Sequence, residues 1–188
     1  MVQTPVRKAL LQEFLQQPET KPASEYIDGE IIQKPMPKTN HSIIQSDLTA
    51  EINGVLKKNK TARAMTELRC VFSGQAIIPD ITVLPWQDIP GKAVGEASAE
   101  DLRIAPPWMI EILSKGQSQS KVMKKIFHAL SNGSKMGWLI DSREKYVFVY
   151  QPNIPTALFE LPEQTLPVPE FAAAFNLTVG ELFSWLLL

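Results

Sequence analysis

Two segments of this 188-residue chain are apolar at nearly every position, and they constrain its fold more than any other feature. Ala76–Leu84 and Trp108–Leu113 are typical of β-strands that are covered on both faces. The chain also contains two strong amphipathic helices, one from Thr39 or Asn40 to about Leu56 and one at about Ser120–Ser131, whose apolar residues recur at helical spacing. The sequence therefore predicts an α/β fold with a central mixed sheet flanked by helices.

Shorter elements complete this prediction, and no repeat or low-complexity segment interrupts them. We expect a single domain over residues 1–188, with a core at about 20–150 and a C-terminal extension at 151–188. The remaining predicted elements are a helix at Ala9–Gln16, a strand pair at Tyr26–Gln33 that turns at Asp28-Gly29, strands at Ala64–Phe72, Met136–Ile140, Tyr146–Tyr150 and Ala157–Leu161, a surface loop at Pro85–Pro107, and a short final helix from about Val179.

Composition excludes several classes of protein. Nineteen Lys and Arg against twenty Asp and Glu give a net charge of -1, so nucleic-acid binding has to rely on a local basic patch. Cys70 is the only cysteine and His41 and His128 are the only histidines, which argues against disulfides, thiolate clusters and three-histidine zinc sites. Met1–Gln16 lacks the pattern of a signal peptide and Leu182–Leu188 is too short to span a membrane, so we expect a cytoplasmic protein without membrane contact.

Each of the two apolar strands is interrupted by one carboxylate. Asp80 follows Pro79 in the middle of the first strand, and Glu111 lies in the middle of the second. A buried carboxylate costs several kcal/mol, on the order of 2–5, unless it is paired or bound to a metal. If the strands are neighbours, the two acids repel each other, and Mg²⁺ or Mn²⁺ would relieve this repulsion with hard oxygen ligands. The alternative is that each acid caps a loop or forms a structural ion pair at a sheet end.

A lysine-rich stretch follows the second acid. Lys121 and Lys125 are stacked at i, i+4 beside the apolar stripe of the predicted helix. A lysine at the edge of that stripe can lean over the sheet towards Glu111, and Lys125 is the best placed to do so. The alternative for all of these lysines, Lys115 and Lys124 included, is a solvated basic surface.

Five short motifs, in order, give the chain a resemblance to a known family. It resembles the Uma2 (DUF820) family of the restriction-endonuclease-like PD-(D/E)XK superfamily over about Leu10 to Tyr150. The motifs are Glu25-Tyr26-Ile27-Asp28-Gly29-Glu30, His41 at the start of a helix, Pro79-Asp80-Ile81-Thr82-Val83, Glu111-Ile112-Leu113-Ser114, and Gly133 with Trp138-Leu139-Ile140-Asp141.

The resemblance implies a metal-dependent endonuclease that hydrolyses DNA phosphodiester bonds. Asp80 and Glu111 would hold Mg²⁺ or Mn²⁺. The superfamily lysine usually lies two residues after the second acid, where this chain has Leu113, and Lys125 would supply it instead, with Lys121 and Lys115 as alternatives. Three further positions depart from the family pattern: Lys115 stands where it has proline, Lys121 where it has aspartate, and Ala129 where it has tyrosine.

Two further residues are candidates for supporting roles. Glu25 could add an outer contact to the metal, although Asp28 and Glu30 lie close by and acids are common at such turns. His41 either contacts phosphate or caps its helix; the commoner situation for a histidine in the first turn of a helix is a polar surface position.

A second function remains open from the sequence. The departures from the family pattern and the near-neutral charge are also compatible with a catalytically inactive scaffold or protein-interaction module. The apolar ending Leu182–Leu188, with Phe183 and Trp185, could pack against a second copy, so we expect a homodimer. A metal-free carboxylate-pair hydrolase is less compatible, because nothing supplies a sugar-binding surface.

Overall fold

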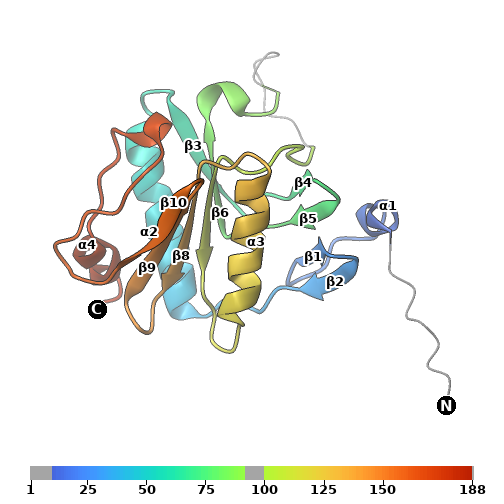
Figure 1. Ribbon diagram of the computed structural model, residues 1–188, viewed down its shortest axis with the longest axis horizontal. Coiled ribbons are helices and arrows are strands. Elements are labelled where there is room, and N and C mark those ends of the chain that lie inside the picture. Colours follow the sequence, from blue (N-terminus) through green and yellow to red (C-terminus); the bar gives the residue numbers. More distant parts are fainter. Residues whose placement is uncertain (1–9, 92–99, 188) are drawn as a thin grey trace.

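The computed structural model describes residues 10–91 and 100–187 and confirms the α/β architecture (Figure 1). Ala9, residues 92–99 of the predicted surface loop, and Leu188 lie outside the described residues. The helices are α1 (Leu11–Leu15), α2 (Thr39–Leu56), α3 (Gln119–Ser131) and α4 (Val179–Ser184), with 3₁₀ turns at Trp86–Asp88 and Glu170–Ala172. The strands are β1 (Ser24–Ile27), β2 (Glu30–Gln33), β3 (Ala62–Thr66), β4 (Cys70–Phe72), β5 (Gln75–Ile77), β6 (Ile81–Pro85), β7 (Trp108–Ile112), β8 (Met136–Asp141), β9 (Tyr146–Gln151) and β10 (Ile154–Phe159).

A six-stranded mixed sheet forms the centre of the molecule, in the order β10-β9-β8-β7-β6-β3. Only the β7–β8 pair is parallel, and its connection runs through α3, because parallel neighbours need a crossover long enough to return the chain to the same end of the sheet. The strands β6 and β7 lie in the interior of this sheet, and every residue of both is buried. The two apolar runs of the sequence therefore contribute its centre.

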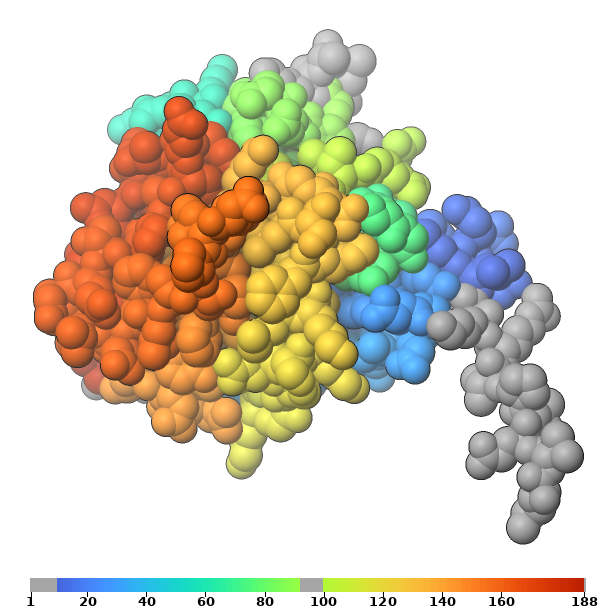
Figure 2. Space-filling view, in the orientation of Figure 1, coloured from blue at the N-terminus to red at the C-terminus, as the bar shows by residue number. Residues whose placement is uncertain are grey.

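Helices cover both faces of this sheet, as the apolar runs predict. Alternate residues of the strands face opposite sides, so that Ile110 and Ile112 pack with α2 and α4, whereas Met109 and Leu113 pack with α3. Figure 2 shows α3 on the surface, between the C-terminal strands and the β1–β2 hairpin. Ile126 of α3 lies directly over Gly137 of β8, where the Cβ of any other residue would overlap its Cγ2 atom. This glycine allows α3 to approach the sheet closely.

The C-terminal apolar run packs on the chain's own core. Leu182 and Phe183 are buried in the cluster formed by α2 and the sheet, and Trp185 is half-buried against it. Leu187 of the same run is exposed, so the homodimer suggested by this ending stays a prediction.

Two predicted strands are each divided into two. Ala64–Phe72 becomes β3 and β4, and Ala76–Leu84 becomes β5 and β6, with the members of each pair in different sheets. The first break contains Glu67 at φ 52°, and the second contains Pro79, which cannot donate to a ladder. A second, four-stranded sheet results, in the order β2-β1-β5-β4.

Other differences from the prediction are small. β10 begins at Ile154 rather than at Ala157 and forms a bulged antiparallel pair with β9. Among the described residues, no helix is long and apolar enough to cross a membrane.

Candidate active site

Asp80 and Glu111 lie side by side at one end of the central sheet. Asp80 immediately precedes β6 rather than lying in the middle of a strand, because the chain changes sheets at Pro79. The antiparallel register pairs Ile81 with Ile110, and the next pair in this register is Asp80 and Glu111. Each is 2% exposed. The two carboxylates predicted to meet are therefore buried at a common point.

The Asp80 carboxylate is held by three groups. Its Oδ1 lies 2.8 Å from the Nζ atom of Lys34, and its Oδ2 lies 3.1 Å from the Nε2 atom of His41. The backbone N–H of Ile112 donates to the same Oδ2 at 2.7 Å. This last bond links the start of β6 to the end of β7 and orients Asp80 towards the neighbouring strand.

Glu111 belongs to a second, connected group. It lies on the α3 face of the sheet, like Met109 and Leu113, and the Nζ atom of Lys125 is 2.9 Å from its Oε1. Lys125 also donates to Oε1 of Glu25 at 2.7 Å, and that oxygen accepts the N–H of Ile78 at 2.8 Å. Elements far apart in the sequence thus meet at Lys125.

Lys125 is buried because it occupies the inner face of α3. The buried positions of this helix are Val122, Lys125, Ile126 and Ala129, which form one stripe at i, i+3, i+4 and i+7. The side chain of Lys125 therefore runs along the sheet, and its ammonium group reaches the acids at the edge of the apolar core.

The pKa values show how strongly these groups interact. Burial and the nearby charge of Asp80 together raise the pKa of Glu111 to about 7, although the ammonium of Lys125 opposes this rise. Burial would also raise the pKa of Asp80, but Lys34 and His41 hold it well below its usual range. Burial opposes the charge of Lys125, yet Glu111 and Glu25 raise its pKa above the ordinary lysine value. Asp80 and Glu111 are thus two carboxylates in electrostatic contact, with opposite pKa shifts.

Two pockets adjoin this cluster. One, of about 300 Å³, is lined by His41, Asp80 and Lys21, and the other, of about 380 Å³, is lined by Glu25, Lys125 and several further lysines. Lys34, Pro35 and Gln117 line both pockets and separate them. A ligand in the first pocket would therefore lie against Asp80 and Lys34, and a ligand in the second against Glu25, Lys34 and Lys125, whereas Glu111 is buried behind both linings.

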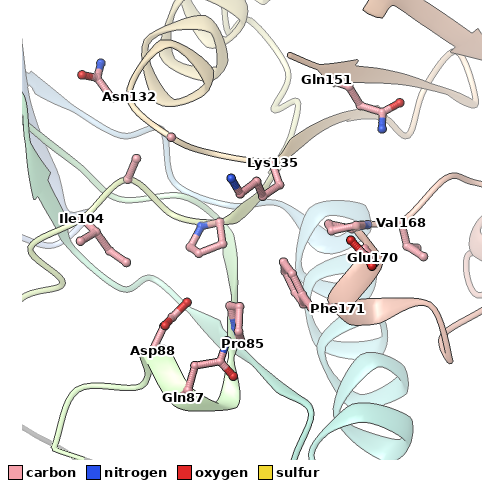
Figure 3. A pocket seen from close by; sticks show the side chains of 14 residues that line it. Pro85, Gln87, Asp88, Ile104, Asn132, Lys135, Gln151, Val168, Glu170 and Phe171 are labelled. Atoms are coloured by element: carbon pink, nitrogen blue, oxygen red, sulfur yellow. The ribbon is translucent and has the colours of Figure 1, made fainter. Parts of the chain in front are cut away.

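A larger pocket, of about 840 Å³, lies at the opposite end of the sheet (Figure 3). Lys135 points into it, with Asp88 and Glu170 at its sides, and its lining includes Pro85 at the far end of β6. It contains none of the site residues predicted from the sequence.

Comparison with known proteins agrees with this arrangement. The model of the Uma2 family, described as putative restriction endonucleases, matches residues 11–180. The chain belongs to the Uma2 family. It is also similar to a putative nuclease of DUF820 from Anabaena variabilis ATCC 29413, whose crystal structure shares 52% sequence identity with a TM-score of 0.92 and covers 95% of this chain and 99% of that one. No curated protein matches the chain.

This Uma2 chain brings all five predicted site residues into one cluster: Glu25, His41, Asp80, Glu111 and Lys125. The surface position expected for His41 is wrong, because the ring is buried against Asp80. Of the three candidate lysines, only Lys125 contacts the acids; Lys115 and Lys121 are exposed on the rim of a pocket and form no ion pair with any described residue.

Three site residues of the Uma2 chain were not predicted: Lys34, Gln45 and Glu67. Gln45 donates to the backbone oxygen of Asp80 at 2.8 Å and to Glu67 at 3.1 Å. Lys34 has no sequence signal, because it lies in a polar, proline-containing segment that resembles a solvated loop. The backbone N–H of Lys34 donates to the backbone oxygen of Ala23 at 2.8 Å and so continues the β1–β2 ladder by one residue. Because side chains alternate along a strand, the side chain of Lys34 lies on the same side of the hairpin as that of Ile32, and both line the same pocket.

The residues present fit a Mg²⁺ or Mn²⁺ ion. Asp80 and Glu111 offer hard oxygen donors, and no described group donates to Oε1 of Glu111 with good hydrogen-bond geometry, although Lys125 is close to it. No set of three or more acidic, histidine or cysteine ligands occurs among the described residues, but Mg²⁺ is commonly held by one or two carboxylates together with water. Two carboxylates are therefore compatible with an ion that keeps several waters in its coordination shell.

The pKa of Glu111 predicts that unfolding depends on pH. Because this pKa is about 7 in the folded chain and near 4.5 in the unfolded one, the folded state retains a proton that the unfolded state has released. This stabilisation is complete below the unfolded value and is lost as pH rises through about 7. In chelator, the free energy of unfolding should fall by on the order of 2 kcal/mol between about pH 5 and about pH 8.

Urea unfolding of the wild type and of Glu111→Gln measures this effect. The variant cannot ionise, so its stability should change less over the same interval. Equal slopes for the two proteins would show that another group carries the pH dependence. Asp80 does not interfere, since its depressed pKa places its own effect at lower pH.

Proposed function

We propose that this Uma2 protein is a Mg²⁺- or Mn²⁺-dependent endonuclease that hydrolyses DNA phosphodiester bonds. The observation that carries the proposal is the pair of buried carboxylates Asp80, which immediately precedes β6, and Glu111 of the neighbouring β7, with the ammonium of Lys125 at 2.9 Å from the second. Structural ion pairs also bury acids, but they do not require a second carboxylate, as here, where the charge of Asp80 raises the pKa of the buried Glu111.

Asp80 and Glu111 would hold the metal. When bound, such an ion polarises a phosphoryl oxygen and lowers the pKa of water. The net charge of the cluster supports cation binding. It contains two ammonium groups, of Lys34 and Lys125, and four carboxylates, of Glu25, Glu67, Asp80 and Glu111. When all six groups are ionised, and without counting His41, the cluster has two net negative charges.

Lys125 would act on the reacting groups. An ammonium has three N–H donors, and Glu25 and Glu111 fix its position without using all three. The remaining donor can orient the attacking water or stabilise the negative charge that develops on the phosphate oxygens as the P–O bond to the leaving sugar oxygen breaks. Because its position is fixed before substrate binds, little reorganisation is needed during the reaction.

The lysines at the pocket rims would bind the substrate. Lys115 and Lys121 line one pocket and Lys21 lines the other, and all three are exposed. With a net charge of -1, the chain has no general attraction for DNA, so these local cations would supply the phosphate contacts. Binding should accordingly weaken steeply with salt.

Calorimetric titration with Mn²⁺, followed by a cleavage assay, tests the proposal. We expect Mn²⁺ to bind the wild type, and plasmid or single-stranded DNA to be cut with Mg²⁺ or Mn²⁺ but not with chelator. RNA in parallel reactions distinguishes the substrate. Absence of both Mn²⁺ binding and cleavage would contradict the proposal and leave the inactive scaffold as the remaining function.

A further inference from the structure

Lys34 occupies a position that is suited to a metal ion. Its Nζ atom lies 2.8 Å from Oδ1 of Asp80, 2.9 Å from the backbone oxygen of Ile78, and 3.2 Å from both carboxylate oxygens of Glu67. Four oxygen atoms from two carboxylates and a carbonyl thus surround one positive charge. Oxygen donors of this kind are those that Mg²⁺ and Mn²⁺ prefer.

The position of Lys34 is well defined. Its side chain is 9% exposed, and although burial lowers its pKa, the negative charges of Asp80, Glu111 and Glu67 together raise that pKa above the ordinary lysine value. The backbone is held by the hydrogen bond from its N–H to Ala23, and the following Pro35 favours an extended conformation. Lys34 is therefore a fixed cation rather than a mobile surface lysine.

Lys34 and Lys125 serve different acids. Lys34 is paired with Asp80, and Lys125 is paired with Glu111 and Glu25. Lys34 also borders both pockets beside the acids, so a phosphate placed in either one would approach its ammonium group. Two-metal nucleases use a second ion at such a position to stabilise charge on the phosphate.

We infer that Lys34 takes the place of a second metal ion, so that this protein acts with a single divalent cation and Lys34 is a catalytic residue that contacts the phosphate. The inference rests on the proposed function. A catalytic role of Lys34 has a consequence that a purely structural role would not have. The positive charge of Lys34 weakens binding of a cation at Asp80, yet it stabilises the negative charge of the reacting phosphate.

Lys34→Met tests this inference with two measurements. Mn²⁺ titration by calorimetry without DNA should show a single ion per wild-type chain. In the variant, the dissociation constant should fall by about tenfold, because a competing charge is lost. Single-turnover cleavage should meanwhile slow by about 100-fold, as for the loss of one charge-stabilising donor. Lys34→Arg, which keeps the charge, should retain Mn²⁺ affinity near that of the wild type.

Lys21→Met is the matched control, because Lys21 lines the same pocket but is exposed. It should leave Mn²⁺ affinity unchanged. If Lys34→Met weakens Mn²⁺ binding and cleavage together, Lys34 merely holds Asp80 in place and the inference is overturned; cleavage at the wild-type rate overturns it too. More than one Mn²⁺ per wild-type chain overturns it even if the variant fails to fold. No Mn²⁺ on the wild type is a different result, which removes the proposed function itself.

Discussion

Lys125→Met is expected to lower the free energy of unfolding by about 3–5 kcal/mol near pH 8. Methionine preserves most of the volume of the lysine stem, so the apolar packing of α3 on the sheet should change little. The ammonium is lost, however, and the buried carboxylates of Glu25 and Glu111 then have no cation beside them. An uncompensated buried charge is among the most destabilising changes that a single substitution can make.

Urea unfolding measures this loss, and its pH dependence identifies the cause. At about pH 5 Glu111 takes up a proton, so the difference from the wild type should shrink. Lys124→Met is the matched control, because Lys124 is the exposed neighbour on the same helix. A Lys125→Met protein within about 1 kcal/mol of the wild type at both pH values would show that the buried pair contributes little.

Asp80→Asn and Glu111→Gln are each expected to reduce metal-dependent cleavage by about 1,000-fold or more, and to weaken Mn²⁺ binding. The metal contributes several kcal/mol of transition-state stabilisation, and each factor of ten in rate corresponds to about 1.4 kcal/mol. Both substitutions keep the shape of the side chain. They should therefore remove the charge that holds the cation without opening a cavity.

The two variants should differ in stability, which separates loss of activity from loss of structure. Asn at position 80 deprives the buried Lys34 of its buried charged partner, leaving only the more exposed Glu67, and should destabilise the chain. Gln at position 111 removes a carboxylate that burial and Asp80 disfavour, so near pH 8 the variant should be about as stable as the wild type. Glu30→Gln, at an exposed acid of the β1–β2 hairpin, is the control. If Glu111→Gln is as stable as expected and still cuts normally, Glu111 is not part of the reaction.

The sequence alone predicted the fold class and five residues of the buried cluster, but not Lys34, Gln45 or Glu67. The covered strand at Trp108–Leu113, the amphipathic helices and the hairpin at Asp28-Gly29 are local patterns, and each was recovered close to its predicted bounds. Asp80 and Glu111 were recognisable because a carboxylate in an apolar strand requires a partner wherever the strand is placed. Lys125 was recognisable by its position on the edge of a helical stripe.

Only the tertiary structure decided which cations partner these acids and where the chain changes sheets. Lys34 reaches Asp80 across 46 residues of sequence, and its local pattern is that of an ordinary polar loop. The division of Ala76–Leu84 into β5 and β6 was likewise hidden, because both halves are buried and apolar and differ only in the sheet that they join. Periodicity and composition report whether a residue is buried, whereas the identity of its neighbours depends on strand order and register, which long-range packing determines.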